Sequence, residues 1–197
     1  MRYQALAIAA ALAVASAAPA QTRFAPKAGP EIRPLVGAFV PTGNQADNFK
    51  TAVLAGGQLA FEMSDYFHIV GQFSWAPSKE KFNVLASHTA DIYQYDAGVE
   101  FNLLQHVNDE WYFRPFAGIG GGGRTYSYNW NVPNKTQGLG YVTLGTEFQR
   151  GIYAIRFEAR DNMSRFEMPT TGATPGKRMT VNDLHFSVGL AYHFSMR

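Results

Sequence analysis

The feature that most constrains this chain is a strict alternation of apolar and polar side chains between residues 91 and 103. One set of positions is apolar or aromatic, namely Tyr93, Tyr95, Ala97, Val99, Phe101 and Leu103, and the other carries Gln94, Asp96, Gly98, Glu100 and Asn102. Successive side chains of a β-strand point to opposite faces of its sheet. The alternation therefore predicts a strand with one apolar face and one polar face.

The same alternation recurs along the chain and predicts eight strands. Their approximate ranges are 31–41, 52–63, 66–76, 91–103, 111–126, 138–149, 152–164 and 181–194. The connections alternate between short turns and longer polar loops, and the longer ones are 42–51, 77–90, 127–137 and 165–180. Strands joined in this way are antiparallel neighbours, with turns at one end of the sheet and loops at the other. We therefore predict an all-β, eight-stranded, antiparallel up-and-down transmembrane β-barrel.

The amino terminus has the pattern of a secretory signal. Arg2 precedes an apolar, alanine-rich run over residues 5–18, and small residues follow it. The run is shorter than the roughly 20 residues that a membrane-spanning helix needs. The sequence predicts a signal peptide over residues 1–20, a periplasmic segment over residues 21–30 and an outer-membrane barrel domain over residues 31–197.

Alternation alone does not say which face of the barrel points inward, because a soluble, secreted, lipocalin-like ligand-binding barrel would carry its apolar face inside. The lysines favour a membrane barrel, since all of them lie outside the predicted strands, whereas a soluble barrel scatters lysines over its surface. The polar faces instead carry arginines and carboxylates in near balance, which predicts an ion-pair network in the lumen. Its expected members are Glu62, Asp96, Glu100, Arg114, Glu147, Arg156, Glu158 and Arg160, with Arg124 as a further candidate.

Aromatic side chains near the ends of the predicted strands also favour a membrane barrel. Membrane barrels carry aromatic girdles at both bilayer interfaces, although aromatic residues are common in any strand. The expected girdle residues are Tyr66, Trp75, Tyr93, Trp111, Tyr141 and Phe194.

The signal sequence, the eight alternating segments, the stretch Arg114–Gly122 and the terminal Leu190-x-Tyr192-x-Phe194 occur together. In this combination the chain resembles the OmpA/OmpX-like small outer-membrane β-barrel domain family. The resemblance implies a barrel of the bacterial outer membrane, in contact with membrane lipid and lipopolysaccharide. It also implies a monomer that the outer-membrane insertion machinery assembles by reading the terminal aromatic residue. Three residues follow Phe194 here, whereas members of the family usually end on phenylalanine.

Composition narrows the possible functions. The chain has no cysteine, which excludes disulfides and thiolate metal sites, and its five histidines lack metal-ligand spacing. The formal net charge is +2 and the chain has no cluster of basic residues, so nothing indicates that it binds nucleic acid. We expect no cofactor and no metal. The run Gly120–Gly123 lacks the Lys-Ser/Thr of a phosphate loop. We interpret it as a bulge at which the strand changes parity, so that the inward-facing and outward-facing positions exchange.

These features predict a structural or surface-interaction role without catalysis, with an extracellular ligand bound through the loops. One alternative is a narrow channel for small solutes. A third is a lipid A-modifying enzyme, because His185-x-Ser187 resembles the His-x-Ser of outer-membrane lipid A deacylases. The parity places both residues on the polar face, away from acyl chains, and no glutamate follows in the strand, so we expect a structural role for them.

Overall fold

A computed structural model describes residues 28–81, 88–108, 110–129, 133–167 and 178–195, so the predicted signal peptide lies outside the described residues. Eight long strands carry the fold: β1 (Ala28–Thr42), β2 (Ala52–Ser64), β3 (Phe67–Lys79), β4 (Thr89–Asn102), β6 (Trp111–Tyr128), β7 (Lys135–Arg150), β8 (Tyr153–Glu167) and β9 (Arg178–Ser195). Two short elements accompany them, a 3-10 turn, η1 (Gly43–Gln45), and a two-residue strand, β5 (Gln105–His106), that pairs with β6. No helix among the described residues is long and apolar enough to cross a bilayer.

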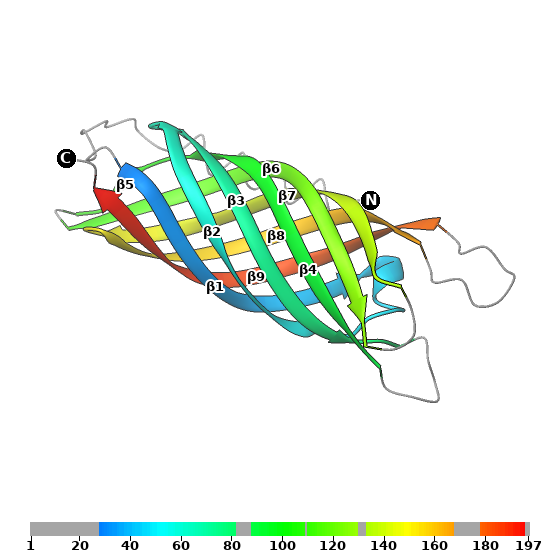
Figure 1. The fold of residues 1–197 in the computed structure, drawn as a ribbon. Coiled ribbons are helices and arrows are strands. Elements are labelled where there is room, and N and C mark those ends of the chain that lie inside the picture. The colour runs from blue at the N-terminus through cyan, green and yellow to red at the C-terminus, as the bar shows by residue number, and fades with distance from the viewer. Residues whose placement is uncertain (1–27, 82–87, 109, 130–132, 168–177, 196–197) are drawn as a thin grey trace, which may run out of the picture.

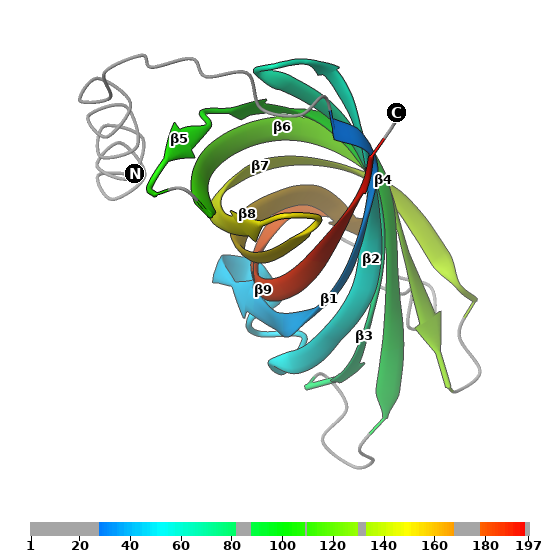
Figure 2. The same cartoon turned by 90° about the vertical axis from the view of Figure 1, so that its left-hand side faces the viewer.

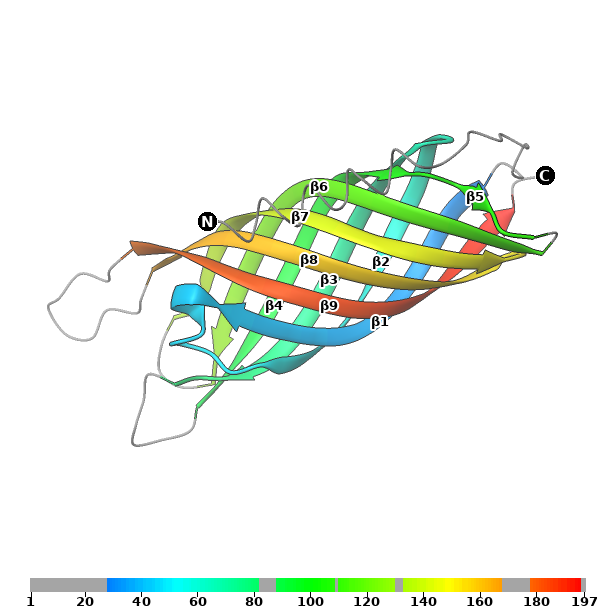
Figure 3. The same cartoon turned by 180° about the vertical axis from the view of Figure 1, so that it is seen from behind.

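The eight long strands form one closed ring. Each pairs antiparallel with its neighbours along the chain, and β1 also pairs with β9 to close the sheet on itself (Figure 1). Because the strands run up and down, the short turns gather at one end of the barrel and the longer connections at the other (Figure 3). We call these the turn end and the loop end. The predicted eight-stranded antiparallel barrel is confirmed.

The middle of each strand presents an apolar outer face. On β9, for example, Phe186, Val188 and Leu190 point outward and are 44–63% exposed. The pattern changes towards the loop end, where the outward positions carry polar side chains such as Asp161 and Asn182. A continuous exposed apolar band that ends in polar residues is the surface expected against lipid.

Several strands extend further towards the loop end than the sequence predicted. β6 continues to Tyr128, and beyond Ile119 its outward positions are glycine, Thr125 and Ser127. The apolar-out pattern that defined the prediction therefore stops before the strand does.

The predicted bulge at Gly120–Gly123 is wrong. β6 keeps one parity from Arg114 to Tyr128, and its pairing with β4 and β7 has no register shift.

The strands enclose an interior, and Figure 2 looks towards it from one end of the barrel. The side chains that fill this interior form two parts. A polar network fills the part nearer the turn end, and an apolar cluster fills the loop end. The cluster comprises Phe39, Phe49, Leu54, Ala76, Ala90, Ile92, Tyr126, Tyr128 and Val181. Its Phe49 comes from the first long connection, where Gln45 and Asn48 are also buried. This connection, predicted as an external loop, thus folds into the barrel mouth.

Replacing Ile119 by arginine should lower the free energy of unfolding by about 2–4 kcal/mol, because a charge would face lipid near the middle of the apolar band. Ser127→Arg is the matched control: it lies on the same face of the same strand beyond the band, in register with Asp91, and should change stability by less than about 1 kcal/mol. Denaturant unfolding in lipid vesicles measures both. Equal losses would show that the apolar band does not mark the bilayer.

Candidate functional site

The polar part of the lumen is one connected network to which all eight long strands contribute. Its charged core consists of five buried arginines and six buried carboxylates: Arg33, Arg114, Arg124, Arg156, Arg160, Glu31, Asp96, Glu100, Glu147, Glu158 and Asp183. The alternation of each strand sends these side chains inward, because an unpaired charge in lipid is costly. Inside, each arginine contacts at least one carboxylate.

Near the turn end, two arginines share Glu31, and each also pairs with a second glutamate. Arg33 pairs with Glu31 on its own strand and reaches Glu100 across the lumen, with Nη1 3.2 Å from Oε2. Arg114 Nη1 lies 3.3 Å from Oε1 of Glu31 and equally far from Oε1 of Glu147. Charge-assisted bonds of this kind are among the strongest in proteins when both partners are enclosed.

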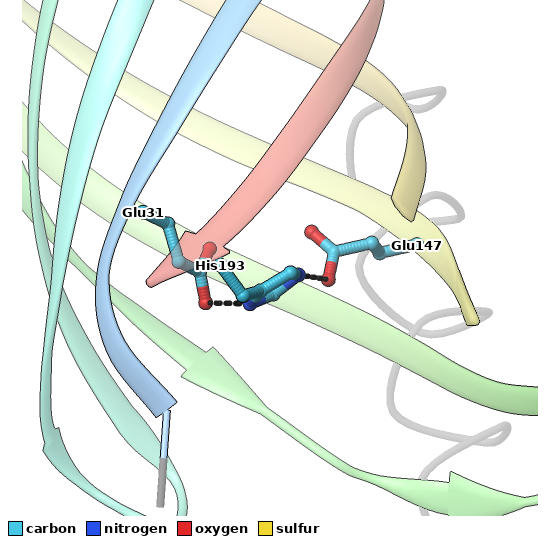
Figure 4. A group of neighbouring side chains, drawn as sticks. All are labelled: Glu31, Glu147 and His193. Atoms are coloured by element: carbon cyan, nitrogen blue, oxygen red, sulfur yellow. Dashed lines mark ion pairs between the residues drawn. The ribbon is translucent and has the colours of Figure 1, made fainter. Parts of the chain in front are cut away.

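His193 lies between Glu31 and Glu147 (Figure 4). Its Nδ1 is 3.0 Å from Glu31 Oε1 and its Nε2 is 3.6 Å from Glu147 Oε1. Ligand atoms of these three residues lie within 4.8 Å of one another, as in a metal site. Arg114, however, already places a cation against both carboxylates. Because this cation already lies against both carboxylates, we assign His193 to the ion-pair network and not to a metal site.

The middle of the network joins β8 to β4 across the lumen. Arg156 pairs with Glu100 and with its neighbour Glu158, the latter at 3.1 Å. Arg160 shares Glu158 at 3.0 Å and pairs with Asp96 at 2.8 Å. Glu158 thus links two arginines two residues to either side of it on β8. Since all these side chains are less than 9% exposed, removing one would leave its partner's charge without compensation.

Aromatic rings on the lumen wall support two of these arginines. The guanidinium carbon of Arg156 lies 3.4 Å from the ring centroid of Phe116, and that of Arg160 lies 3.9 Å from the centroid of Tyr141. The ring of Phe116 packs against Gly145, which leaves room for it because a Cβ at position 145 would lie 2.4 Å from Phe116 Cζ. Stacking and ion pairing therefore fix the guanidinium planes together.

Towards the loop end, the network closes on Arg124 and Asp183. Arg124 binds Asp183 with both terminal nitrogens and also donates to Gln94. Asn162 donates to Asp183 at 3.0 Å. Gln45, from the first connection, lies 2.9 Å from the same carboxylate, and its amide donates to it when the side-chain oxygen is turned to accept from Tyr126. This carboxylate therefore ties the inserted connection to the network.

Seven of the eight predicted lumen residues belong to the charged core named above. The eighth, Glu62, lies inward in register with His68 and is half-buried. The sequence prediction missed Glu31 and Arg33, because the inward Leu35 and Gly37 and the outward Pro34 obscure the parity of β1. It also missed Asp183, although that residue shares the parity of His185.

Four of the predicted girdle residues, Tyr66, Trp75, Trp111 and Phe194, are 37–42% exposed near the strand ends, and Tyr93 is half-exposed and outward. Tyr141 is a correction: it faces the lumen beneath Arg160 and is 5% exposed. Its aromatic character suggested an interface, whereas its parity on β7 is that of Glu147.

His185 and Ser187, the pair considered for catalysis, both face the lumen on β9. His185 Nε2 lies 3.0 Å from Asp183 Oδ1, and its ring packs edge-on against Phe39 with 5.6 Å between centroids. The imidazole of His185 therefore contacts both Asp183 of the network and Phe39 of the apolar cluster.

Comparisons with known proteins agree with this architecture. The model of the outer membrane protein beta-barrel domain matches residues 6–194. The outer membrane protein OprG from Pseudomonas aeruginosa superposes with a TM-score of 0.61 at 12% identity, covering 86% of this chain and 98% of that one. Neisserial surface protein A gives 0.60 at 11% identity, covering 84% and 97%. These identities show the fold alone, and no curated protein sequence matches. The family match and the lipid-facing band place the barrel in the bacterial outer membrane.

Arg156→Met should lower the free energy of unfolding by about 3–5 kcal/mol, because Glu100 and Glu158 would lose a buried cation. The double variant Arg156→Met with Glu100→Met should recover part of that loss. Arg150→Met is the control: its pair with Glu110 is 58% and 62% exposed, and its loss should cost less than about 1 kcal/mol. Denaturant titration distinguishes the three, and equal effects of Arg156→Met and Arg150→Met would contradict a buried network.

Proposed function

Since this chain belongs to the outer membrane protein β-barrel domain family, we propose that it is a closed, monomeric barrel with a structural or surface-interaction role and no catalytic activity. The filled lumen is the observation that carries this proposal. In a barrel of eight strands the interior is only wide enough to be filled by side chains. Here five arginines and their partners occupy it from β1 to β9.

The charged network and the apolar cluster at the loop end both block the lumen, one above the other. We call them the two seals. Phe49 stacks on Tyr126 with 5.4 Å between ring centroids and 17° between ring planes, and neither side chain is exposed. The inserted connection is fixed to β3, because the Lys50 amide donates to the Lys79 carbonyl and the Lys81 amide to the Asn48 carbonyl. A hydrated ion would have to displace both layers, which argues for a closed barrel over the channel alternative.

The position of His185 and Ser187 supports a role without catalysis. Both side chains lie inside the barrel, whereas the acyl chains of lipid A lie against its outer face. A nucleophile must contact the bond that it attacks. Recognition is better supplied at the loop end, which faces outside the cell in barrels of this type.

Single-channel recording in planar bilayers tests the closed lumen. The wild-type protein should give no steady current, and neither Phe49→Ala nor Arg124→Ala alone should open it, because the other seal remains. The double variant should conduct, since both seals are weakened. Gel migration before and after heating checks that each variant is folded. A stable, ohmic current from the folded wild-type protein would establish the channel alternative instead.

Mass spectrometry of lipid A tests the absence of catalysis. Membranes containing the wild-type protein, His185→Ala or no protein should show the same acyl pattern. Loss of an acyl chain that depends on the wild-type protein and is abolished by His185→Ala would show an enzyme.

A further inference from the structure

Three lysines gather on one side of the loop end. Phe49 and Glu80 form an antiparallel bridge in which both side chains are buried, at 0% and 5% exposure. Their neighbours therefore point the other way, and Lys50, Lys79 and Lys81 are all exposed. The Lys50 amide donates to the Lys79 carbonyl at 2.9 Å, so these two residues lie side by side on adjacent extended segments. We call the three residues the lysine patch.

The lysine patch lacks acidic partners among the residues that the structure describes. Like charges on neighbouring extended segments repel each other, which makes their pairing unfavourable without a counter-ion. Lys81 Nζ donates to the Ala46 carbonyl at 2.6 Å, and no ion pair joins Lys50 or Lys79 to a described carboxylate. The nearest outward acid on β4, Asp91, accepts from the indole of Trp75 at 2.8 Å. The exposed Asp47 also lies in the inserted connection and offsets part of the positive charge.

The height of the patch above the lipid band follows from the distance between Trp75 and Lys79 along β3. Trp75 points outward and is 40% exposed, and Lys79 lies four residues further on the same face. Four residues of strand span about 13 Å, or about 10 Å along the membrane normal for a strand tilted by about 40°. Tryptophan marks the interface between hydrocarbon and headgroups. Lys79, and Lys50 beside it, therefore lie at the level of the lipid headgroups.

We propose that the lysine patch binds the phosphate groups of lipid A in the surrounding outer leaflet. Lysine is a common phosphate ligand, and its flexible chain lets the ammonium group reach a headgroup beside the barrel. The patch faces sideways, above lipid-exposed β3, so the anions nearest to it belong to the leaflet. This inference depends on the outer-membrane location and is independent of whether the lumen is closed.

Lipid binding to the detergent-solubilised protein tests the patch. Native mass spectrometry would compare bisphosphorylated lipid A with the same lipid after removal of its phosphates. The wild-type protein should prefer the phosphorylated form. Lys50→Gln with Lys79→Gln should weaken that binding about 10-fold or more, because each lysine near an anionic surface contributes about a factor of five. Lys50→Arg with Lys79→Arg should retain it.

Arg150→Gln is the matched control, because it removes an exposed positive charge at the turn end, far from the outer leaflet. It should leave lipid A binding unchanged. Equal binding of phosphorylated lipid A by the wild-type and double glutamine variants would overturn the proposal. So would patch-dependent binding of a sulfated oligosaccharide without binding of lipid A, which would assign the lysines to a soluble glycan.

Discussion

The structure depends on the exclusion of unpaired polar and charged groups from lipid. Backbone amides and carbonyls satisfy this constraint by pairing around a closed ring, which needs β1 to meet β9. Charged side chains satisfy it by pointing inward, where they must then find partners because the lumen is as narrow as the side chains that fill it. The continuous contacts from Arg33 and Glu31 to Arg124 and Asp183 follow from these two requirements.

Period-two alternation was enough to predict the barrel, its antiparallel order and most of the charged lumen, because lipid imposes one rule on every strand that crosses it. The rule weakens where lipid no longer touches the wall. Beyond Ile119 the outward face of β6 becomes polar while Tyr126 and Tyr128 turn inward, so the sequence pattern reads as a loop although the strand continues. Tyr141 faces the lumen because it lies on the same face of β7 as Glu147, so alternation predicts its position better than its aromatic character does.

Contacts between strands that are distant in sequence were beyond prediction from the sequence. Parity says that Asp96 and Arg160 both face inward, but only the barrel's register brings Nη1 within 2.8 Å of Oδ1. The same holds for the insertion of Phe49 and Gln45 into the mouth, since nothing in their local sequence marks a connection that folds back into the barrel. A single alternating pattern thus fixes the direction of a side chain, whereas its partner is fixed by the number and stagger of the strands.

The join between the first and last strands also bears on how the molecule is assembled. Glu31 and Arg33 lie on β1, His193 and Asp183 lie on β9, and their partners Glu147, Arg114 and Arg124 lie on β6 and β7. Until the two terminal strands meet, this set of charges is incomplete, and an open sheet exposed to lipid would hold unmatched guanidinium and carboxylate groups. Closure is therefore the step that pairs these interior charges. The polypeptide enters the hydrocarbon most readily once β1 and β9 have paired.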